Sequence, residues 1–284
     1  MPARASSEAR LVVVEPGGFW PALDLREWWE HRDLLYFLAW RDVRVRYKQT
    51  VLGVAWVLLQ PVVSLAVMSL LFGRMLKVPT GGVPYPVFAY AALLPWTFFA
   101  TAVARAAQSL VANARLVTKV YFPRLLIPVA SVLAGVVDLA ASLALLVVLL
   151  LYYHVPLGVG LLFMPLFLGL ALAAALAFGL WLAALNVRFR DVSHLVPFLL
   201  QLWLYVTPVL YGLDLVPGRL QPWIGLNPLA GVVLGFRWAV LAGRPDAGPL
   251  PALLLAQGAG IILVVLVLGL VLFRSTERTF ADFV

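Results

Sequence analysis

The chain has 284 residues, of which 63% are hydrophobic and only 12% are charged, and its mean hydropathy is +0.99. Soluble domains carry about 25% charged residues, so this composition excludes a water-soluble globular domain, and it is too apolar for a disordered chain. The absence of cysteine excludes a disulfide framework, a thiolate metal site and a thiol nucleophile. What remains is a polytopic membrane protein. The net charge of +8 is explained below by the positions of the cations, without nucleic acid.

Residues 34–50 have the pattern of an amphipathic helix that follows an N-terminal segment, residues 1–33, without a secretory signal. The apolar positions recur at intervals of three and four: Tyr36, Trp40, Val43, Tyr47 and Val51. Arg44 and Lys48 flank this stripe on one edge and Arg46 flanks it on the other. Such a helix lies in the lipid headgroup plane. It serves either as a simple anchor or as a lever that connects a cytoplasmic partner to the first span.

Six long apolar stretches follow, and a helix needs about 20 apolar residues to cross the hydrocarbon core. They are residues 51–72, 85–104, 125–151, 161–185, 195–211 and 250–273. The fifth is the shortest and contains Pro197 and Pro208. Continuous runs of this length differ from the alternating ten-residue strands of a β-barrel. The sequence therefore predicts an all-α protein with six transmembrane helices.

The cations orient these spans. With six crossings, both termini lie on one side of the membrane, together with the second and fourth connections between spans. That side carries sixteen Lys and Arg residues, and the other side carries five. By the positive-inside rule both termini are cytoplasmic, including the tail at 274–284. The short charged connection at 186–191 is interpreted as one of these anchors.

The cytoplasmic connection at 113–124 is predicted to contain a short amphipathic helix, with Asn113 as its N-cap. Arg115 and Lys119 stack at i and i+4, and Pro123 limits the helix. The apolar residues share another face: Leu116, Val117 and Val120. This helix either rests on lipid headgroups or docks into a groove of another protein.

Between the fifth and sixth spans, residues 213–249 are rich in proline and contain an apolar stretch, 229–241, that is too short to cross. We expect short re-entrant or interfacial helices on the outer face, which form either a gate or a packed cap.

Polar residues within the spans are few. Gln60 precedes Pro61, which predicts a kink in the first span. Asp138 lies near the middle of the third span, where a lipid-exposed carboxylate costs about 2.5–3.5 kcal/mol. We expect it to face a helix interface in a structural hydrogen-bonding role, because the other spans offer no second carboxylate for a proton relay.

Aromatic residues are concentrated in the second and fifth spans. Those near the ends are typical interface belts, whereas those at mid-depth are candidates for lining a path on which sugar rings stack. The candidate channel-lining residues are Trp56, Phe88, Tyr90, Trp96, Phe98, Phe99, Trp203 and Tyr205.

The sequence provides no catalytic or metal-binding chemistry. A phosphate-binding loop needs Gly-Lys followed by Ser or Thr, and the three lysines, Lys48, Lys77 and Lys119, follow Tyr, Leu and Thr. The three histidines are isolated, so no metal site or catalytic triad is expected. If transport is driven by ATP, a separate subunit hydrolyses it, and this chain binds no cofactor of its own.

Several motifs, taken together and in order, resemble the permeases of polysaccharide-exporting ABC transporters of the O-antigen and teichoic-acid type. They are YFLAWRDVRVRYKQTVLG at 36–53, LQP at 59–61, PYP at 84–86, LPW at 94–96, KVYFPR at 119–124, LNVRFRD at 185–191, PF at 197–198 and LNP at 226–228. The resemblance covers residues 25–273, and each motif lies in the matching topological place.

The resemblance implies a homodimer in the cytoplasmic membrane, with an ATPase subunit that holds ATP and magnesium below each copy. Residues 34–48 would be an interface helix and 113–124 a coupling helix, and the domain at 51–273 would carry a lipid-linked glycan outward between the copies. The implied ATPase-coupling residues are Arg41, Arg44, Lys48, Asn113, Arg115, Leu116, Lys119, Tyr121, Phe122 and Arg124. The alternatives are an ABC efflux permease for a drug or small lipid and an ion-coupled carrier.

Overall fold

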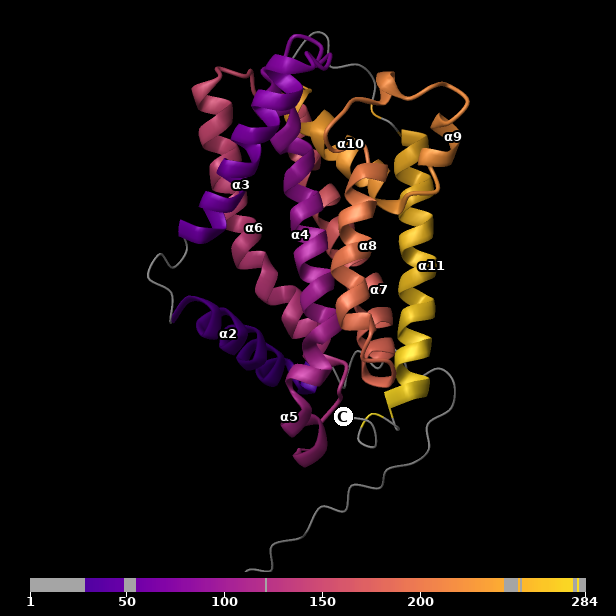
Figure 1. The fold of residues 1–284 in the computed structure, drawn as a ribbon. Coiled ribbons are helices and arrows are strands. Elements are labelled where there is room, and N and C mark those ends of the chain that lie inside the picture. Colours follow the sequence, from indigo (N-terminus) through magenta and orange to yellow (C-terminus); the bar gives the residue numbers. More distant parts are fainter. Residues whose placement is uncertain are drawn as a thin grey trace, which may run out of the picture.

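The computed structural model describes residues 29–48, 55–120, 122–242, 250, 252–277 and 280, with the backbone alone at 55–57. In this part of the chain all regular structure is helical (Figure 1). The helices are α2 (Arg32–Lys48), α3 (Ala55–Met68), the π-helix η2 (Ser69–Met75), α4 (Tyr85–Ala112), α5 (Ala114–Lys119), α6 (Leu126–Tyr152), η3 (Val159–Phe163), α7 (Met164–Arg188), α8 (Val192–Val206), η4 (Leu213–Leu215), α9 (Gln221–Ile224), α10 (Pro228–Leu241) and α11 (Ala252–Glu277).

Five helical stretches of the described residues are long and apolar enough to cross a membrane. They are Leu58–Met75, Tyr85–Ala112, Leu126–Tyr152, Val159–Arg188 and Ala252–Glu277. The predicted fifth span corresponds to α8, which is apolar but has only 15 residues. The expectation of an all-helical multi-pass protein is therefore confirmed, while the crossing by α8 stays a prediction.

Three predicted boundaries differ from the structure by several residues. α8 ends at Val206 rather than at 211. α4 continues to Ala112 rather than ending at 104, so Arg105 lies inside a membrane helix and not in the following connection. The predicted coupling segment, 113–124, is helical only in α5, at Ala114–Lys119.

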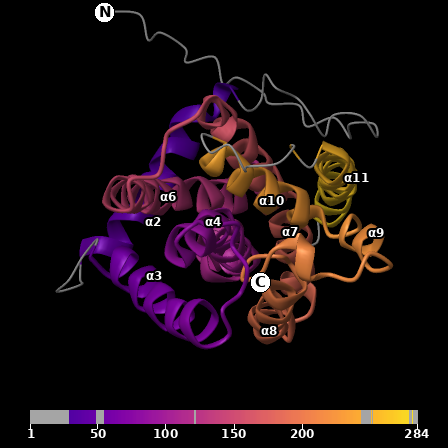
Figure 2. The ribbon, with the colours of Figure 1, turned by 90° about the horizontal axis from the view of Figure 1, so that it is seen from above.

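α4 is the central helix of the bundle. It stands in the middle of the helices in Figure 2 and contacts α3, α6, α7, α8 and α10. Most of its side chains are buried. Small residues permit this packing: a Cβ added to Gly179 of α7 would lie 2.8 Å from the Cβ of Ala106 in α4. α3, by contrast, has few buried side chains and stands at the edge of the bundle, where Figure 2 shows its backbone.

α10 is short but deeply buried. Pro228 occupies its first turn, and the Asn227 side chain accepts a hydrogen bond from the Leu229 amide at 3.1 Å, which is a typical N-cap. Asn227 also accepts a hydrogen bond from the Trp203 indole at 3.0 Å and donates one to the Thr207 hydroxyl at 2.9 Å. These bonds hold the beginning of α10 against the end of α8.

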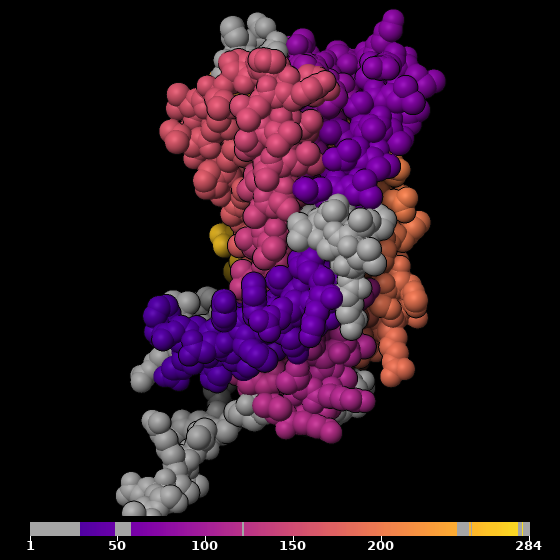
Figure 3. Space-filling model, turned by 90° about the vertical axis from the view of Figure 1, so that its left-hand side faces the viewer, coloured from indigo at the N-terminus to yellow at the C-terminus, as the bar shows by residue number. Residues whose placement is uncertain are grey.

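α2 lies across the lower part of the bundle and packs against α6 (Figures 1 and 3). Its first half approaches α5, the short helix that projects from the lower end of α4 (Figure 1). The region 213–242, with α9 and α10, lies toward the opposite end (Figure 1). The bundle therefore has an end that carries α2 and α5, and an end formed by the turn after η2 and the segments around α9.

Candidate functional site

The amphipathic helix α2 has an inward face and an exposed face. Leu38 is 2% exposed and belongs to an apolar cluster at the lower end of α4, α5 and α6. Of the predicted apolar stripe, Val43 is buried and Tyr47 is half-buried, but Tyr36 and Trp40 are exposed. The stripe is therefore split: its inward positions pack on protein, because α6 occupies that side, and the outward ones do not.

The exposed face of α2 combines aromatic rings with cations. Phe37 lies beside Tyr36 and Trp40 on this face, and the Arg44 guanidinium lies 5.9 Å from the Trp40 ring centroid. Lys48 is exposed at the end of the helix. Rings with cationic neighbours are suited to the boundary between lipid headgroups and hydrocarbon.

Arg41 joins α2 to the turn between α4 and α5. Its guanidinium donates to the side-chain oxygen of Asn113 at 2.7 Å and to Asp42 at 2.9 Å. Asp42 in turn accepts a weak hydrogen bond from Ser131 of α6 at 3.3 Å. Asn113 is the N-cap residue of α5, as predicted, but its side chain makes no cap hydrogen bond and instead donates to the Ser109 carbonyl at 2.8 Å.

A second polar contact ties the end of α2 to two membrane helices. Asp138 of α6 accepts hydrogen bonds from Arg46 and Tyr47 of α2, and from Arg105 of α4 at 2.8 Å. These four residues are called the Asp138 cluster below. Burial, together with the hydrogen bond to Asp138, raises the pKa of Tyr47, so its hydroxyl keeps its proton and remains a donor.

The Asp138 cluster explains how a carboxylate is tolerated in the middle of a membrane helix. Its side chain is only 15% exposed, and two guanidinium groups share one of its oxygens. Buried charges persist where they are paired and hydrogen-bonded. The expected structural role of Asp138 thus has named partners: one carboxylate and two cations join α2, α4 and α6.

α5 presents its cations away from the bundle. Val117 is 2% exposed and packs in the same apolar cluster as Leu38, whereas Arg115 and Lys119 are exposed at the tip. Leu116 is half-buried. α5 is therefore held to the bundle by its buried side, and its charged side is accessible to another protein.

Two other predicted coupling residues serve internal contacts. Phe122 is buried in the apolar cluster. The backbone amide of Arg124 donates to the Glu277 carboxylate at 2.8 Å, and its guanidinium donates to the Glu277 carbonyl, so the beginning of α6 is tied to the end of α11. Tyr121 lies outside the described residues.

In a comparison with known protein families, residues 33–241 match the ABC-2 type transporter family. The chain belongs to that family. It is 33% identical over 264 residues to the O-antigen export system permease protein RfbA of Myxococcus xanthus, covering 91% of this chain and 98% of that relative.

Two further relatives of this ABC-2 family member extend over most of both chains. An RfbA permease of Klebsiella pneumoniae is 29% identical over 251 residues, covering 88% of this chain and 94% of the relative. The polysialic acid transport protein KpsM of Escherichia coli is 25% identical over 248 residues, covering 84% and 91%. The similarity therefore includes α2 and α5 as well as the membrane helices.

The predicted channel-lining aromatics of this ABC-2 chain occupy different environments. Five of them are buried in the core of the single chain: Phe88, Tyr90, Trp96, Phe98 and Phe99. Trp203 is half-buried and its ring packs edge-on at 5.3 Å from that of Phe99, while Tyr205 is 58% exposed on α8. The five core rings do not line an open path in this conformation, because their partners within the chain cover them. The side chain of Trp56 lies outside the described residues.

Sequence reasoning missed three residues that organise this ABC-2 chain: Arg105, Glu277 and Arg237. The helical pattern of buried positions continues past 104 at Ala106 and Leu110, and that signal would have placed Arg105 within the helix. Arg237 of α10 is buried and donates to the carbonyls of Phe88, Val209 and Tyr211 at 3.2, 2.5 and 3.1 Å. A single arginine in an apolar stretch gives no sign of this in sequence. Gln60, singled out as a polar span residue, is exposed on α3.

Proposed function

We propose that this chain is the membrane-spanning permease subunit of an ATP-driven ABC exporter that moves a lipid-linked polysaccharide, such as an O-antigen, across the cytoplasmic membrane. The observation that carries the proposal is the similarity over 91% of the chain to an O-antigen export permease. The geometry supports the proposal, since α2 and α5 are joined by polar and apolar contacts at one end of the membrane helices. This position is suited to receive the motion of an ATPase subunit.

In this proposal the chain crosses the membrane six times, with α8 as the fifth crossing and α9 and α10 as short re-entrant helices on the outer side. The distribution of Lys and Arg supports cytoplasmic termini. The parts are a cytoplasmic segment at 1–33, the interface helix at 34–50, the permease domain at 51–273 and a tail at 274–284.

Two copies of the chain would pair, and an ATPase subunit would bind each copy from the cytoplasmic side. ATP and magnesium would reside on that subunit. The exposed Arg115 and Lys119 of α5 would contact it, and motion of α5 would pass through the Arg41–Asn113 hydrogen bond to α2. The Asp138 cluster would then transmit the motion of α2 to α4 and α6.

The glycan would pass between the two copies. α3 and α8 are suited to face this path or the second copy, because both leave large side chains uncovered in the single chain, including Val63, Val67, Phe198 and Tyr205. Among the members of the predicted set whose side chains the structure describes, Tyr205 is the one exposed for contact with sugar rings.

The coupling role is tested by a double charge reversal, Arg115→Glu with Lys119→Glu, in cells that contain the ATPase subunit. Glycan export should fall while the chain still accumulates in the membrane, because both residues are exposed and make no core contact. The conservative exchange Arg115→Lys with Lys119→Arg keeps the charges and is the matched control. Unchanged export in the charge-reversed variant would refute the coupling role.

The substrate is tested separately with the purified transporter in lipid nanodiscs. Lipid-linked glycan should stimulate ATP hydrolysis more than hydrophobic drugs do at the same concentration. Stronger stimulation by drugs would favour the efflux alternative. Transport driven by a pH gradient without the ATPase subunit would favour an ion-coupled carrier.

A further inference from the structure

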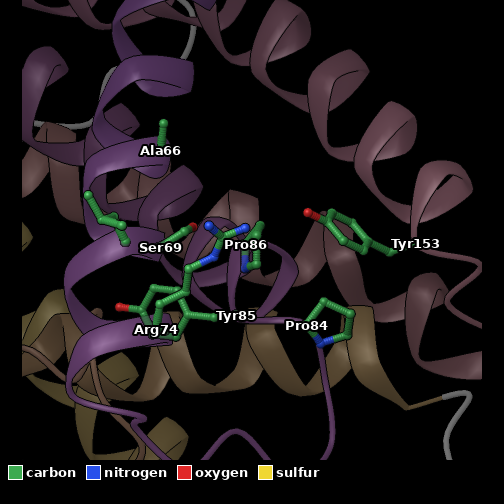
Figure 4. Close-up of a pocket in the computed structure, with 9 residues that line it drawn as sticks. Ala66, Ser69, Arg74, Pro84, Tyr85, Pro86 and Tyr153 are labelled. Carbon is green, nitrogen blue, oxygen red and sulfur yellow. The ribbon is translucent and has the colours of Figure 1, made fainter.

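A cavity of about 580 Å³ lies between the end of the first membrane helix, the beginning of α4 and the end of α6. This is the end of the bundle opposite α2 and α5 (Figure 1), and Figure 4 shows the residues that line the cavity. The volume lies within the range of ligand pockets, about 300–1,000 Å³. The lining residues are Ala66, Ser69, Leu70, Gly73, Arg74, Pro84, Tyr85, Pro86 and Tyr153.

The cavity is shaped by the π-helix η2. Its wider turn is seen in the i→i+5 hydrogen bond from the Leu76 amide to the Leu71 carbonyl, 2.9 Å long. Gly73 allows η2 to approach α4, since a Cβ at this position would lie 3.0 Å from the Cβ of Tyr85. The Tyr85 hydroxyl donates to the Leu210 carbonyl at 3.1 Å, which fixes this wall. π-turns inside helices occur frequently at functional sites.

Besides Tyr85, whose hydroxyl is already bonded, three polar side chains line the cavity and have no acceptor in the described part of the protein. Among the described residues, Arg74 and the Tyr153 hydroxyl have no hydrogen-bond or ion-pair partner. The Ser69 hydroxyl oxygen is buried and likewise unpaired. In Figure 4 the Arg74 guanidinium extends toward Ser69, and the Tyr153 hydroxyl points into the cavity from the end of α6. The lining contains no carboxylate, so the site favours an anion with several acceptor oxygens.

The remaining lining is apolar, and the cavity is open beside α3. Ala66, Leu70 and Arg74 are exposed at successive turns. Val63 and Val67 continue this exposed apolar surface along α3. An anionic group in the cavity can therefore be attached to a hydrocarbon chain that lies along α3.

We propose that this cavity binds the phosphate group of a lipid, with Arg74 as its ion-pair partner and the hydroxyls of Ser69 and Tyr153 as hydrogen-bond donors. The phosphate belongs either to a bilayer phospholipid or to the carrier lipid of the exported glycan. The second source rests on the proposed function; the binding site itself does not.

The test uses the full chain purified with its ATPase subunit, and native mass spectrometry to measure lipid binding. The probes are a polyprenyl phosphate, the polyprenol of the same length, phosphatidylglycerol, and inorganic phosphate as a competitor. The phosphorylated lipids should bind at least about tenfold more tightly than the polyprenol, as expected for a charge-assisted hydrogen bond. Arg74→Gln should remove this difference, and Ser69→Ala should reduce it. Lys77→Gln is the matched control, because Lys77 is an exposed cation close by that does not line the cavity.

Tighter binding of polyprenyl phosphate than of phosphatidylglycerol would assign the site to the carrier lipid, and the reverse order would assign it to the bilayer. The proposal is overturned if polyprenol binds as tightly as its phosphate, if Arg74→Gln leaves all affinities unchanged, or if inorganic phosphate competes at the concentrations of the lipids. Intact lipid binding by a chain that exports no glycan would refute the proposed function and leave this site standing.

Discussion

Neutralising Asp138 is the most direct way to separate α2 from the membrane helices. In the Asp138→Asn variant the side chain keeps its size but loses its charge. Arg46 and Arg105 both donate to the same carboxylate oxygen, so the variant leaves two guanidinium groups facing each other without a counter-charge. We predict that the end of α2 detaches from α6 while the bundle stays folded.

The magnitude follows from the geometry. Two hydrogen bonds of ordinary length, about 3 Å, to one oxygen place the two donor nitrogens no more than about 6 Å apart. At that distance like charges repel by about 3 kcal/mol at an effective dielectric constant of about 20. Breaking a buried ion pair costs about 3–5 kcal/mol, and the partial exposure of Arg46 and Arg105, 25% and 32%, reduces this. We expect α2 docking to weaken by about 2–4 kcal/mol, which is roughly thirty- to seven-hundred-fold.

Amide hydrogen exchange measures this directly on the purified complex. Where exchange reports the local opening equilibrium, its rate rises by the same factor as that equilibrium. Peptides that cover the end of α2, around Arg46 and Tyr47, should therefore exchange roughly thirty- to seven-hundred-fold faster in Asp138→Asn, while peptides from α7 keep their rates. Asp214→Asn removes an exposed carboxylate near the other end and should change neither set.

The double variant Arg46→Gln with Asp138→Asn tests the cause. It removes one of the two facing cations, so α2 should exchange more slowly than in Asp138→Asn alone. Three results would contradict the reasoning: unchanged exchange in α2, equal acceleration in all helices, or a double variant in which the two effects simply add.

Three further changes probe other contacts. Tyr47→Phe removes one hydrogen bond to Asp138 and should weaken α2 docking by about 0.5–1.5 kcal/mol. The same α2 peptides should then exchange faster than in the unmodified protein, but less so than in Asp138→Asn. An acceleration as large as that of Asp138→Asn would contradict the assigned partners. Arg237→Met leaves three carbonyls without their donor and should lower the stability of the region around α10 by about 2–4 kcal/mol. The measurements are a lower thermal unfolding temperature and faster proteolysis around 207–227, and unchanged proteolysis would refute the role of Arg237. Gly231→Ala places a Cβ against the Leu254 backbone and should separate α10 from α11. Faster amide exchange in both helices would show this separation. Unchanged exchange would contradict it and mean that the helices adjust.

The aromatic residues show where prediction from sequence stops. Their enrichment in the second span was visible in sequence, but whether a ring faces a path or the core depends on the helices around it. Phe99 is buried because Trp203 of α8 and Phe178 of α7 pack against it. Phe99 and Trp203 are separated in sequence by about half the length of the transmembrane region. Local periodicity carries no information on contacts between residues so far apart in sequence.

The sequence by itself determined the class of the protein, the membrane helices within a few residues of most boundaries, and the existence of α2 and α5. These properties depend on hydropathy and on helical spacing, which are local. Only the tertiary structure decided that Arg105 pairs with Asp138, that the Asn113 side chain binds Arg41 rather than an amide of α5, and that an isolated arginine in α10 binds three carbonyls. Each of these depends on which helices meet and at what height, because a buried polar side chain is satisfied by a partner distant in sequence.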